Sequence, residues 1–145
     1  MLEVYLGISV IVGLVVIYDG YLVIKNSGVI KVGQFSIVTT TIEFLWTIVS
    51  IVALFNLEFQ NWQRLIPVFY VTHNVLGWAY GVWLVAQNPT EQSGQTTVPM
   101  WYAKFGFNFG VVFTLSSLLV QYQMTYNKQF KRDSQRLAFL LLLQF

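Results

Sequence analysis

The sequence contains no cysteine and one histidine, and few of its residues are charged. Without cysteine there is no disulfide, no thiolate nucleophile and no cysteine-ligated metal. With His73 alone, a single chain offers neither a histidine pair for a haem nor a multi-histidine metal site. We therefore expect no metal and no cofactor. The net charge of +2 is scattered along the chain, so no nucleic-acid partner is expected.

The scarcity of charge points to a membrane. Charged residues make up 10% of the chain, against about 25% in a soluble domain, while 56% of the residues are apolar. A soluble fold of 145 residues cannot hide that much apolar surface. The apolar residues also form four long runs, each near the ~20 residues that cross a hydrocarbon layer. We predict an all-α polytopic membrane protein, a four-transmembrane-helix bundle that forms a single domain over residues 1–145.

Polar segments separate the predicted spans, the first of which is expected to act also as a signal anchor. The spans and the loop between the last two cover about residues 2–24, 34–57, 65–86 and 100–123, with a polar loop over 87–99. In the tail, 124–145, a charged stretch precedes Leu137–Phe145. Because that apolar segment is too short to span a bilayer, we predict a short C-terminal helix on the membrane surface. The alternative is the start of a further, truncated span.

Lysine and arginine predict the orientation. The side that holds both termini carries Arg64 and the four basic residues of the tail, whereas the other side carries Lys25, Lys31 and, near the start of its span, Lys104. Basic residues favour the cytoplasmic side, so both termini are predicted to be cytoplasmic. The membrane would be that of the endoplasmic reticulum in a eukaryote and the cytoplasmic membrane in a prokaryote.

Every predicted span carries polar side chains. A charged group at the bilayer centre costs at least ~2.5–3.5 kcal/mol, so such groups usually face the bundle interior and find a partner. At ~1.5 Å per residue, one group of them falls within roughly 10 Å in depth. That group comprises Glu43, Asn108, His73 and Asn74, with Asp19 and Lys104 nearer the loop side.

Two interpretations of these polar groups stay open. In the structural interpretation, Glu43 and His73 form an internal ion pair, and Asn108 holds helices together by hydrogen bonds. Asp19 then pairs with Lys104. In the functional one, the groups share a site. Trp46 follows Glu43 by three residues and so shares its helix face, where a ring could stabilise a cationic species or simply pack.

Several short patterns resemble one membrane family. They are Tyr18-Asp19-Gly20-Tyr21-Leu22-Val23-Ile24, the mid-span Glu43, Trp62-x-Arg64 followed by Tyr70-x-x-His73, and Tyr102 followed by Asn108. Together they resemble the EXPERA group, which includes the sterol isomerases and the sigma-two receptor. Val15 stands where the isomerases have a histidine, which puts isomerase activity in question. The spacing of Lys25 and Glu43 also resembles that of fungal membrane terpene cyclases.

Both resemblances imply related chemistry. A neutral carboxylic acid in an apolar cavity protonates an alkene, aromatic faces and a second carboxylate steady the carbocation, and a base removes a proton. They imply Glu43 as proton donor and Asp19 as partner carboxylate or base. His73 and Asn108 would then orient or relay. The implied substrate-binding residues are Trp46, Tyr70, Asn74, Trp78, Tyr80 and Trp101.

The implied ligand is a hydrophobic small molecule: a sterol, a terpenoid or an amphipathic amine, bound among membrane lipid. Other classes of function stay open. One is a non-catalytic lipid-binding scaffold or an accessory subunit of a larger membrane complex, with a homo-oligomer as one form. Another is a proton-relay or transport protein, since acids and a histidine across spans can form a relay. A cavity beneath Glu43 favours ligand binding, and a Glu43–His73 pair in a packed interior favours the scaffold.

Overall fold

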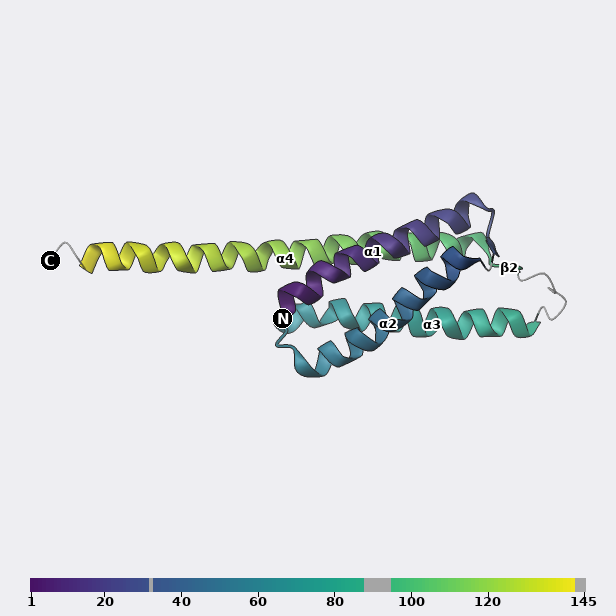
Figure 1. The fold of residues 1–145 in the computed structure, drawn as a ribbon, viewed down its shortest axis with the longest axis horizontal. Helices are drawn as coiled ribbons and strands as arrows, with labels where there is room; N and C mark the ends of the chain where they lie inside the picture. Colours follow the sequence, from purple (N-terminus) through teal and green to yellow (C-terminus); the bar gives the residue numbers. More distant parts are fainter. Residues whose placement is uncertain (32, 88–94, 143–145) are drawn as a thin grey trace.

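Four long helices dominate the computed structural model, which describes residues 1–31, 33–87 and 95–142 (Figure 1). In chain order the elements are α1 (Leu2–Lys25), β1 (Val29–Lys31), α2 (Gln34–Asn56), the 3-10 helix η1 (Asn61–Arg64), α3 (Leu65–Gln87), β2 (Gln95–Thr97) and α4 (Met100–Leu142). The all-helical prediction is confirmed. Most of the predicted polar loop over 87–99 lies outside the described residues.

Three of these helices, α1, α2 and α4, are long and apolar enough to cross a membrane. This indicates an integral membrane protein. Helix α3 is also 23 residues long, but it is not among the three, and its middle carries the polar sequence Thr72-His73-Asn74. Its place in the membrane is taken up below.

A two-stranded sheet closes one end of the bundle. Strand β1 pairs antiparallel with β2, with Ile30 opposite Thr96, so the α1–α2 connection is tied to the start of α4. The turn before β1 needs the left-handed conformation at Gly28, whose φ is 86°. The Gly28 amide donates to the Val23 carbonyl at 2.9 Å and its carbonyl accepts from the Val98 amide at 2.8 Å. This turn therefore ends α1 and holds its C-terminal end against the N-terminal end of α4.

Helices α1 and α4 pack antiparallel and more closely than any other pair. Glycines make this approach possible. A Cβ on Gly20 would lie 2.8 Å from the Phe107 backbone, and a Cβ on Gly110 would lie 2.9 Å from the Ile17 nitrogen. Small residues at such positions are the usual device for close packing of membrane helices, because lipid supplies no hydrophobic force between them.

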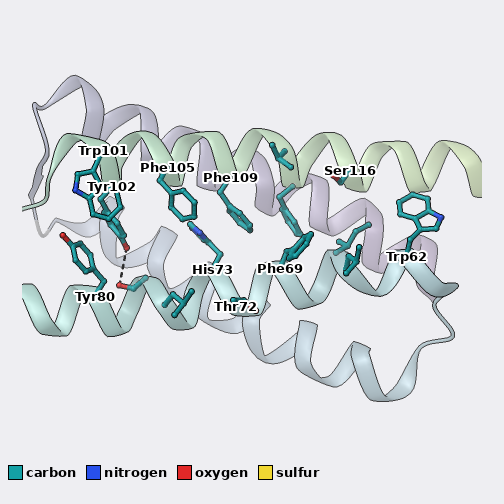
Figure 2. Close-up of a pocket in the computed structure, with 16 residues that line it drawn as sticks. Trp62, Phe69, Thr72, His73, Tyr80, Trp101, Tyr102, Phe105, Phe109 and Ser116 are labelled. Carbon is teal, nitrogen blue, oxygen red and sulfur yellow. Dashed lines mark hydrogen bonds between the residues drawn. The ribbon is translucent and has the colours of Figure 1, made fainter.

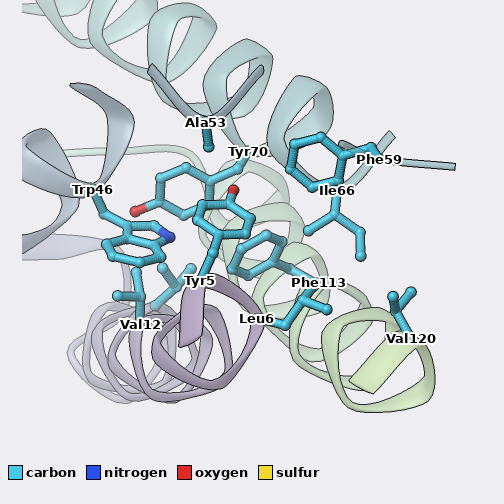
Figure 3. Packing of buried hydrophobic residues seen from close by; sticks show 11 residues of the cluster. Tyr5, Leu6, Val12, Trp46, Ala53, Phe59, Ile66, Tyr70, Phe113 and Val120 are labelled. Carbon is cyan, nitrogen blue, oxygen red and sulfur yellow. The ribbon is translucent and has the colours of Figure 1, made fainter. Parts of the chain in front are cut away.

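The main core lies toward the other end, where all four helices meet (Figure 3). The Tyr5 ring stacks on Trp46 with centroids 5.2 Å apart, and it meets Phe59 edge-on at 5.9 Å. The Tyr5 hydroxyl lies 3.0 Å from Ser50 Oγ, a hydrogen bond buried in this core. By contrast, a cavity lined by Val29, Ile30 and Val98 among other residues opens at the sheet end of the bundle.

Helix α4 continues well past the bundle. It runs unbroken for 43 residues, about 64 Å at 1.5 Å per residue, against about 40–45 Å for a bilayer with its headgroups. Figure 1 shows its C-terminal part projecting beyond the N-terminus. The prediction of a separate short C-terminal helix is therefore wrong, whereas the end of the span near 123 stays a prediction. The chain has no glycine or proline after Gly110, so nothing in the sequence breaks the helix there.

Candidate functional site

One cavity collects the acidic side chains of the spans. It measures about 360 Å³ and is lined by Asp19 of α1, Glu43 of α2, His73 of α3 and Tyr102 of α4, among other residues. We call it the carboxyl cavity. The structure thus brings Glu43 and His73, which were predicted at similar depth, together with Asp19, which was predicted nearer the loop side. Each of the four long helices contributes a polar side chain to it.

Among the described residues no cationic side chain forms an ion pair with the carboxyl groups in this cavity. In the described part of the chain the one ion pair joins Glu3 to Lys128, so neither a Glu43–His73 pair nor an Asp19–Lys104 pair is formed. Asp19 and Glu43 line this one cavity from neighbouring helices, so charges on both groups would repel each other. The interpretation of Glu43 and His73 as an internal ion pair is therefore wrong.

A hydroxyl supplements the two acids. Ser36, about two helical turns before Glu43 on α2, lines the cavity with its hydroxyl-bearing side chain. Among the described side chains no group of three histidine, cysteine or acidic residues is placed to hold a metal ion. What the cavity offers a ligand is therefore a pair of oxygen acids, a hydroxyl and an imidazole.

His73 is the most informative of these residues. Its Nδ1 is buried and has no hydrogen-bond partner among the described residues, and its ring stacks on Phe109 with centroids 3.7 Å apart and planes at 7°. A buried polar atom without a partner is uncommon, because losing its hydrogen bond to water costs about 1–3 kcal/mol. His73 thus lines the carboxyl cavity with a ring whose Nδ1 no described residue satisfies.

A second, larger space adjoins the first. It is a groove of about 570 Å³ between α3 and α4, and His73 and Tyr102 line it as well as the carboxyl cavity. Figure 2 shows aromatic rings along its length, from Tyr80 and Trp101 at one end to Trp62 at the other. We call it the aromatic groove. Its other aromatic lining residues are Phe69, Phe105, Phe109 and Phe113.

The predicted substrate-binding residues divide between the groove and the rest of the bundle. Tyr80 and Trp101 line the aromatic groove, and their rings lie 5.7 Å apart. Trp46 belongs to the core, where it stacks on Tyr5. Trp78 contacts Phe44 of α2 with ring centroids 5.4 Å apart. Neither Trp46 nor Trp78 lines the carboxyl cavity or the groove.

Tyr70 and Asn74 line neither the carboxyl cavity nor the aromatic groove. The Tyr70 hydroxyl donates to the backbone carbonyl of Glu43 at 3.4 Å, which joins α3 to α2 just below the carboxyl cavity. Asn74 Nδ2 donates to the Tyr70 carbonyl at 3.1 Å within α3. Both side chains are buried, so they position the helices that carry Glu43 and His73.

Asn108 is not part of the site. Its side chain is exposed, as is that of Lys104 one turn earlier. Gly110 is buried against α1, and two residues along a helix correspond to about 200° of rotation, so Asn108 faces almost directly away from α1. The structure does not support the predicted role of Asn108 in orienting or relaying.

Some site residues escaped the sequence prediction. Tyr102 joins the cavity to the groove and donates its hydroxyl to the Gly77 carbonyl at 3.3 Å. Phe105 and Phe109 flank His73. The signal was present in the sequence, since Tyr102, Phe105 and Phe109 recur every three or four residues and so share one helix face.

Comparisons of the chain with family models, with curated proteins and with solved structures find no match. The chemistry of the site therefore follows from its geometry. That geometry consists of two acids in one cavity, an imidazole with an unpaired nitrogen, and an aromatic groove on the far side of that imidazole.

Proposed function

We propose that this protein binds a hydrophobic small molecule of sterol, terpenoid or amphipathic amine type inside a membrane. The observation that carries the proposal is that His73 and Tyr102 line both the aromatic groove and the carboxyl cavity. A ligand in the groove would bury its apolar body among aromatic rings. Its unsaturated or cationic part would lie within reach of the imidazole and the acids.

For the topology, we propose that α3 is a fourth span. The helix runs alongside the others in Figure 1, and its polar His73 faces the cavity and the groove. Alternation of four spans places the N-terminus, η1 and the projecting part of α4 on one side. Arg64 and the basic residues after Asn127 lie on that side, which favours a cytoplasmic location for both termini.

The proposed chemistry is acid-catalysed rearrangement of an alkene, as the likeness to the EXPERA group and to membrane terpene cyclases implies. Neutral Glu43 gives its proton to one alkene carbon, and the other becomes a carbocation. The π faces of the groove and the Asp19 carboxylate stabilise that cation. A neighbouring carbon then gives a proton to Asp19 and the double bond forms at its new position. Proton exchange between the two acids restores the starting state, so the net change is isomerisation.

The test is mass spectrometry of lipids extracted from the purified protein. We expect a hydrophobic ligand to be retained by the natural protein and lost or much reduced in Glu43→Gln and Asp19→Asn. Glu3→Gln is the matched control, because it removes an acid that lies outside the cavity. Equal retention by all four proteins would refute a role of the carboxyl cavity in binding. Turnover of the identified ligand, unchanged in both cavity variants, would refute the proposed chemistry.

A second candidate function is that of an accessory subunit or self-associating scaffold. The observation that favours it is the outward face of α4, where Asn108 is exposed among apolar residues one turn after the exposed Lys104. An exposed amide in hydrocarbon is costly, and an asparagine pair across two helices satisfies both amides. Tyr122, Tyr126 and Phe130 continue the same exposed face beyond the bundle.

Self-association is measured by light scattering of the purified protein in detergent. We expect a dimer or larger species for the natural chain and a shift to monomer for Asn108→Leu. Leu115→Ala, on the same exposed face, is the control for general loss of apolar contact. A natural chain that is monomeric at every concentration would contradict this second candidate.

A further inference from the structure

Helix α4 carries a concentration of basic residues just past the bundle. Four of the eight lysines and arginines of the chain lie within nine residues of this helix: Lys128, Lys131, Arg132 and Arg136. Asp133 is the one acid among them, so residues 128–136 carry a net charge of +3, more than the +2 of the whole chain. All five of these side chains are exposed. This part of α4 is therefore a strongly positive surface.

The positive surface continues the face of α4 that packs against α1. Successive residues of a helix are rotated by about 100°, so Gly110, Lys128 and Arg132 lie within about 40° of one another around the axis. Gly110 is packed against Ile17 of α1, but α1 begins at Leu2. Figure 1 shows α4 running on past that point. Beyond it, the described part of the chain leaves this face of α4 uncovered.

A hollow lies where this face passes the first turn of α1. Its lining residues are Glu3 of α1 and Gln121, Thr125, Lys128, Gln129 and Arg132 of α4. Lys128 Nζ lies 2.6 Å from Glu3 Oε1. Arg132 forms no ion pair with any residue that the structure describes. The hollow thus offers a guanidinium, an ammonium and the side-chain amides of two glutamines as hydrogen-bond donors.

The length of α1 indicates the depth of the hollow in a membrane. The charged ends of this helix, Glu3 and Lys25, are 22 residues or about 33 Å apart, close to the ~30 Å of the hydrocarbon layer. Glu3 therefore lies at the edge of that layer, and its partner Lys128 lies beside it. Arg132, one turn further along α4, is about 6 Å further out, within the headgroup layer of about 5–7 Å. Lipid phosphate groups occupy that layer.

We propose that this hollow binds the phosphate of an anionic phospholipid. Arg132 presents the planar fork of donors that suits two phosphate oxygens, and Lys128 adds a second positive charge. Toward the bundle from the hollow, Ile8 and Ile11 of α1 and Leu118 of α4 are exposed and contact the acyl chains. The depth of the hollow favours a lipid over a soluble acidic peptide, which would have to enter the headgroup layer. This site is separate from the carboxyl cavity and independent of its ligand.

Native mass spectrometry of the purified full chain in detergent tests this proposal. The probes are phosphatidylglycerol and phosphatidylcholine with the same acyl chains, so the two lipids differ only in the headgroup. We expect phosphatidylglycerol to bind at least about tenfold more tightly, because the choline cation of the other lipid is repelled by the basic residues of the hollow.

Arg132→Gln and Lys131→Gln are the matched variants. Each removes one exposed positive charge, but only Arg132 lines the hollow. Arg132→Gln should weaken phosphatidylglycerol binding about tenfold, because it removes a charge-assisted hydrogen bond, whereas Lys131→Gln should weaken it less than about threefold. Glu3→Gln should strengthen binding, since it removes the carboxylate that competes with the phosphate for Lys128. Exposed surface substitutions of this kind leave the fold intact.

Three results would overturn the proposal. Equal affinity for the two lipids would show that the hollow does not distinguish their headgroups. Equal weakening by Arg132→Gln and Lys131→Gln would show attraction to the overall charge of the helix without a site. Tighter binding of hexaglutamate or of soluble glycerol phosphate than of phosphatidylglycerol would show that the occupant comes from solution and not from the bilayer.

Discussion

The glycine contacts between α1 and α4 give a prediction whose size follows from the structure. In Gly20→Ala the new Cβ would lie 2.8 Å from backbone atoms of Phe107, whereas ordinary contact begins at 3.4 Å. The obstacle is backbone, so no side chain can turn away and the helices must separate by about 0.6 Å. Overpacking of this kind costs about 1–3 kcal/mol. The better helix propensity of alanine offsets about 0.5–1 kcal/mol of that cost.

Gly81→Ala is the matched control. A Cβ at Gly81 meets nothing within 4 Å, so this variant should gain about 0.5–1 kcal/mol from helix propensity alone. The two variants should therefore differ by about 1–3 kcal/mol, which is the overpacking cost alone. For a chain of this length that difference corresponds to a gap in Tm of roughly 2–12 °C.

Thermal unfolding in detergent, followed by circular dichroism at 222 nm, measures this gap. We expect Gly81→Ala to unfold above the natural protein and Gly20→Ala below it. Because Gly20 adjoins Asp19, the displaced helix should also lower ligand retention in Gly20→Ala. If Gly20→Ala were as stable as Gly81→Ala, the backbones of α1 and α4 would not be in contact at Gly20. The pairing of Gly20 with Phe107 described above would then be wrong.

Three further predictions concern single contacts. Tyr5→Phe leaves the buried Ser50 hydroxyl without its partner and should cost about 1–2 kcal/mol, and adding Ser50→Ala should recover part of the loss in a denaturation cycle. His73→Phe removes an unpaired buried nitrogen and should leave Tm unchanged or higher while ligand retention falls; a large loss of Tm would mean that Nδ1 has a structural partner. Glu3→Gln should change the free energy of unfolding by less than about 1 kcal/mol, and this change should shrink in high salt, which screens the exposed Glu3–Lys128 pair. A change that is larger in high salt than in low salt would contradict the exposed setting of the pair.

The depth of each polar group could be predicted from sequence, but its direction could not. Counting residues places Glu43, His73 and Asn108 at similar depth because helix rise is nearly constant. Which way each side chain points depends on which face of its helix is packed. For α4 that face is set by Gly110, whose lack of a side chain allows α1 to approach, and this packing turns Asn108 outward.

The extended α4 and the aromatic groove illustrate two other limits. Charge after Gln123 marks where a span leaves the hydrocarbon, but leaving the membrane does not end a helix when no residue breaks it. The groove arises because α3 and α4 lie further apart than α1 and α4. That spacing depends on tertiary packing, so the aromatic face of Tyr102, Phe105 and Phe109 indicates a lining but not the space it lines.

The central claim is that Asp19 and Glu43 share one cavity, and cross-linking in the membrane tests it most directly. The natural chain has no cysteine, so pairs can be introduced without background. Asp19→Cys with Glu43→Cys should be joined rapidly by a short bifunctional maleimide, as seen by altered gel mobility. Glu43→Cys with Asn108→Cys, matched in depth but facing apart, should not. Equal cross-linking of the two pairs, or of neither, would contradict the arrangement of the acids described here.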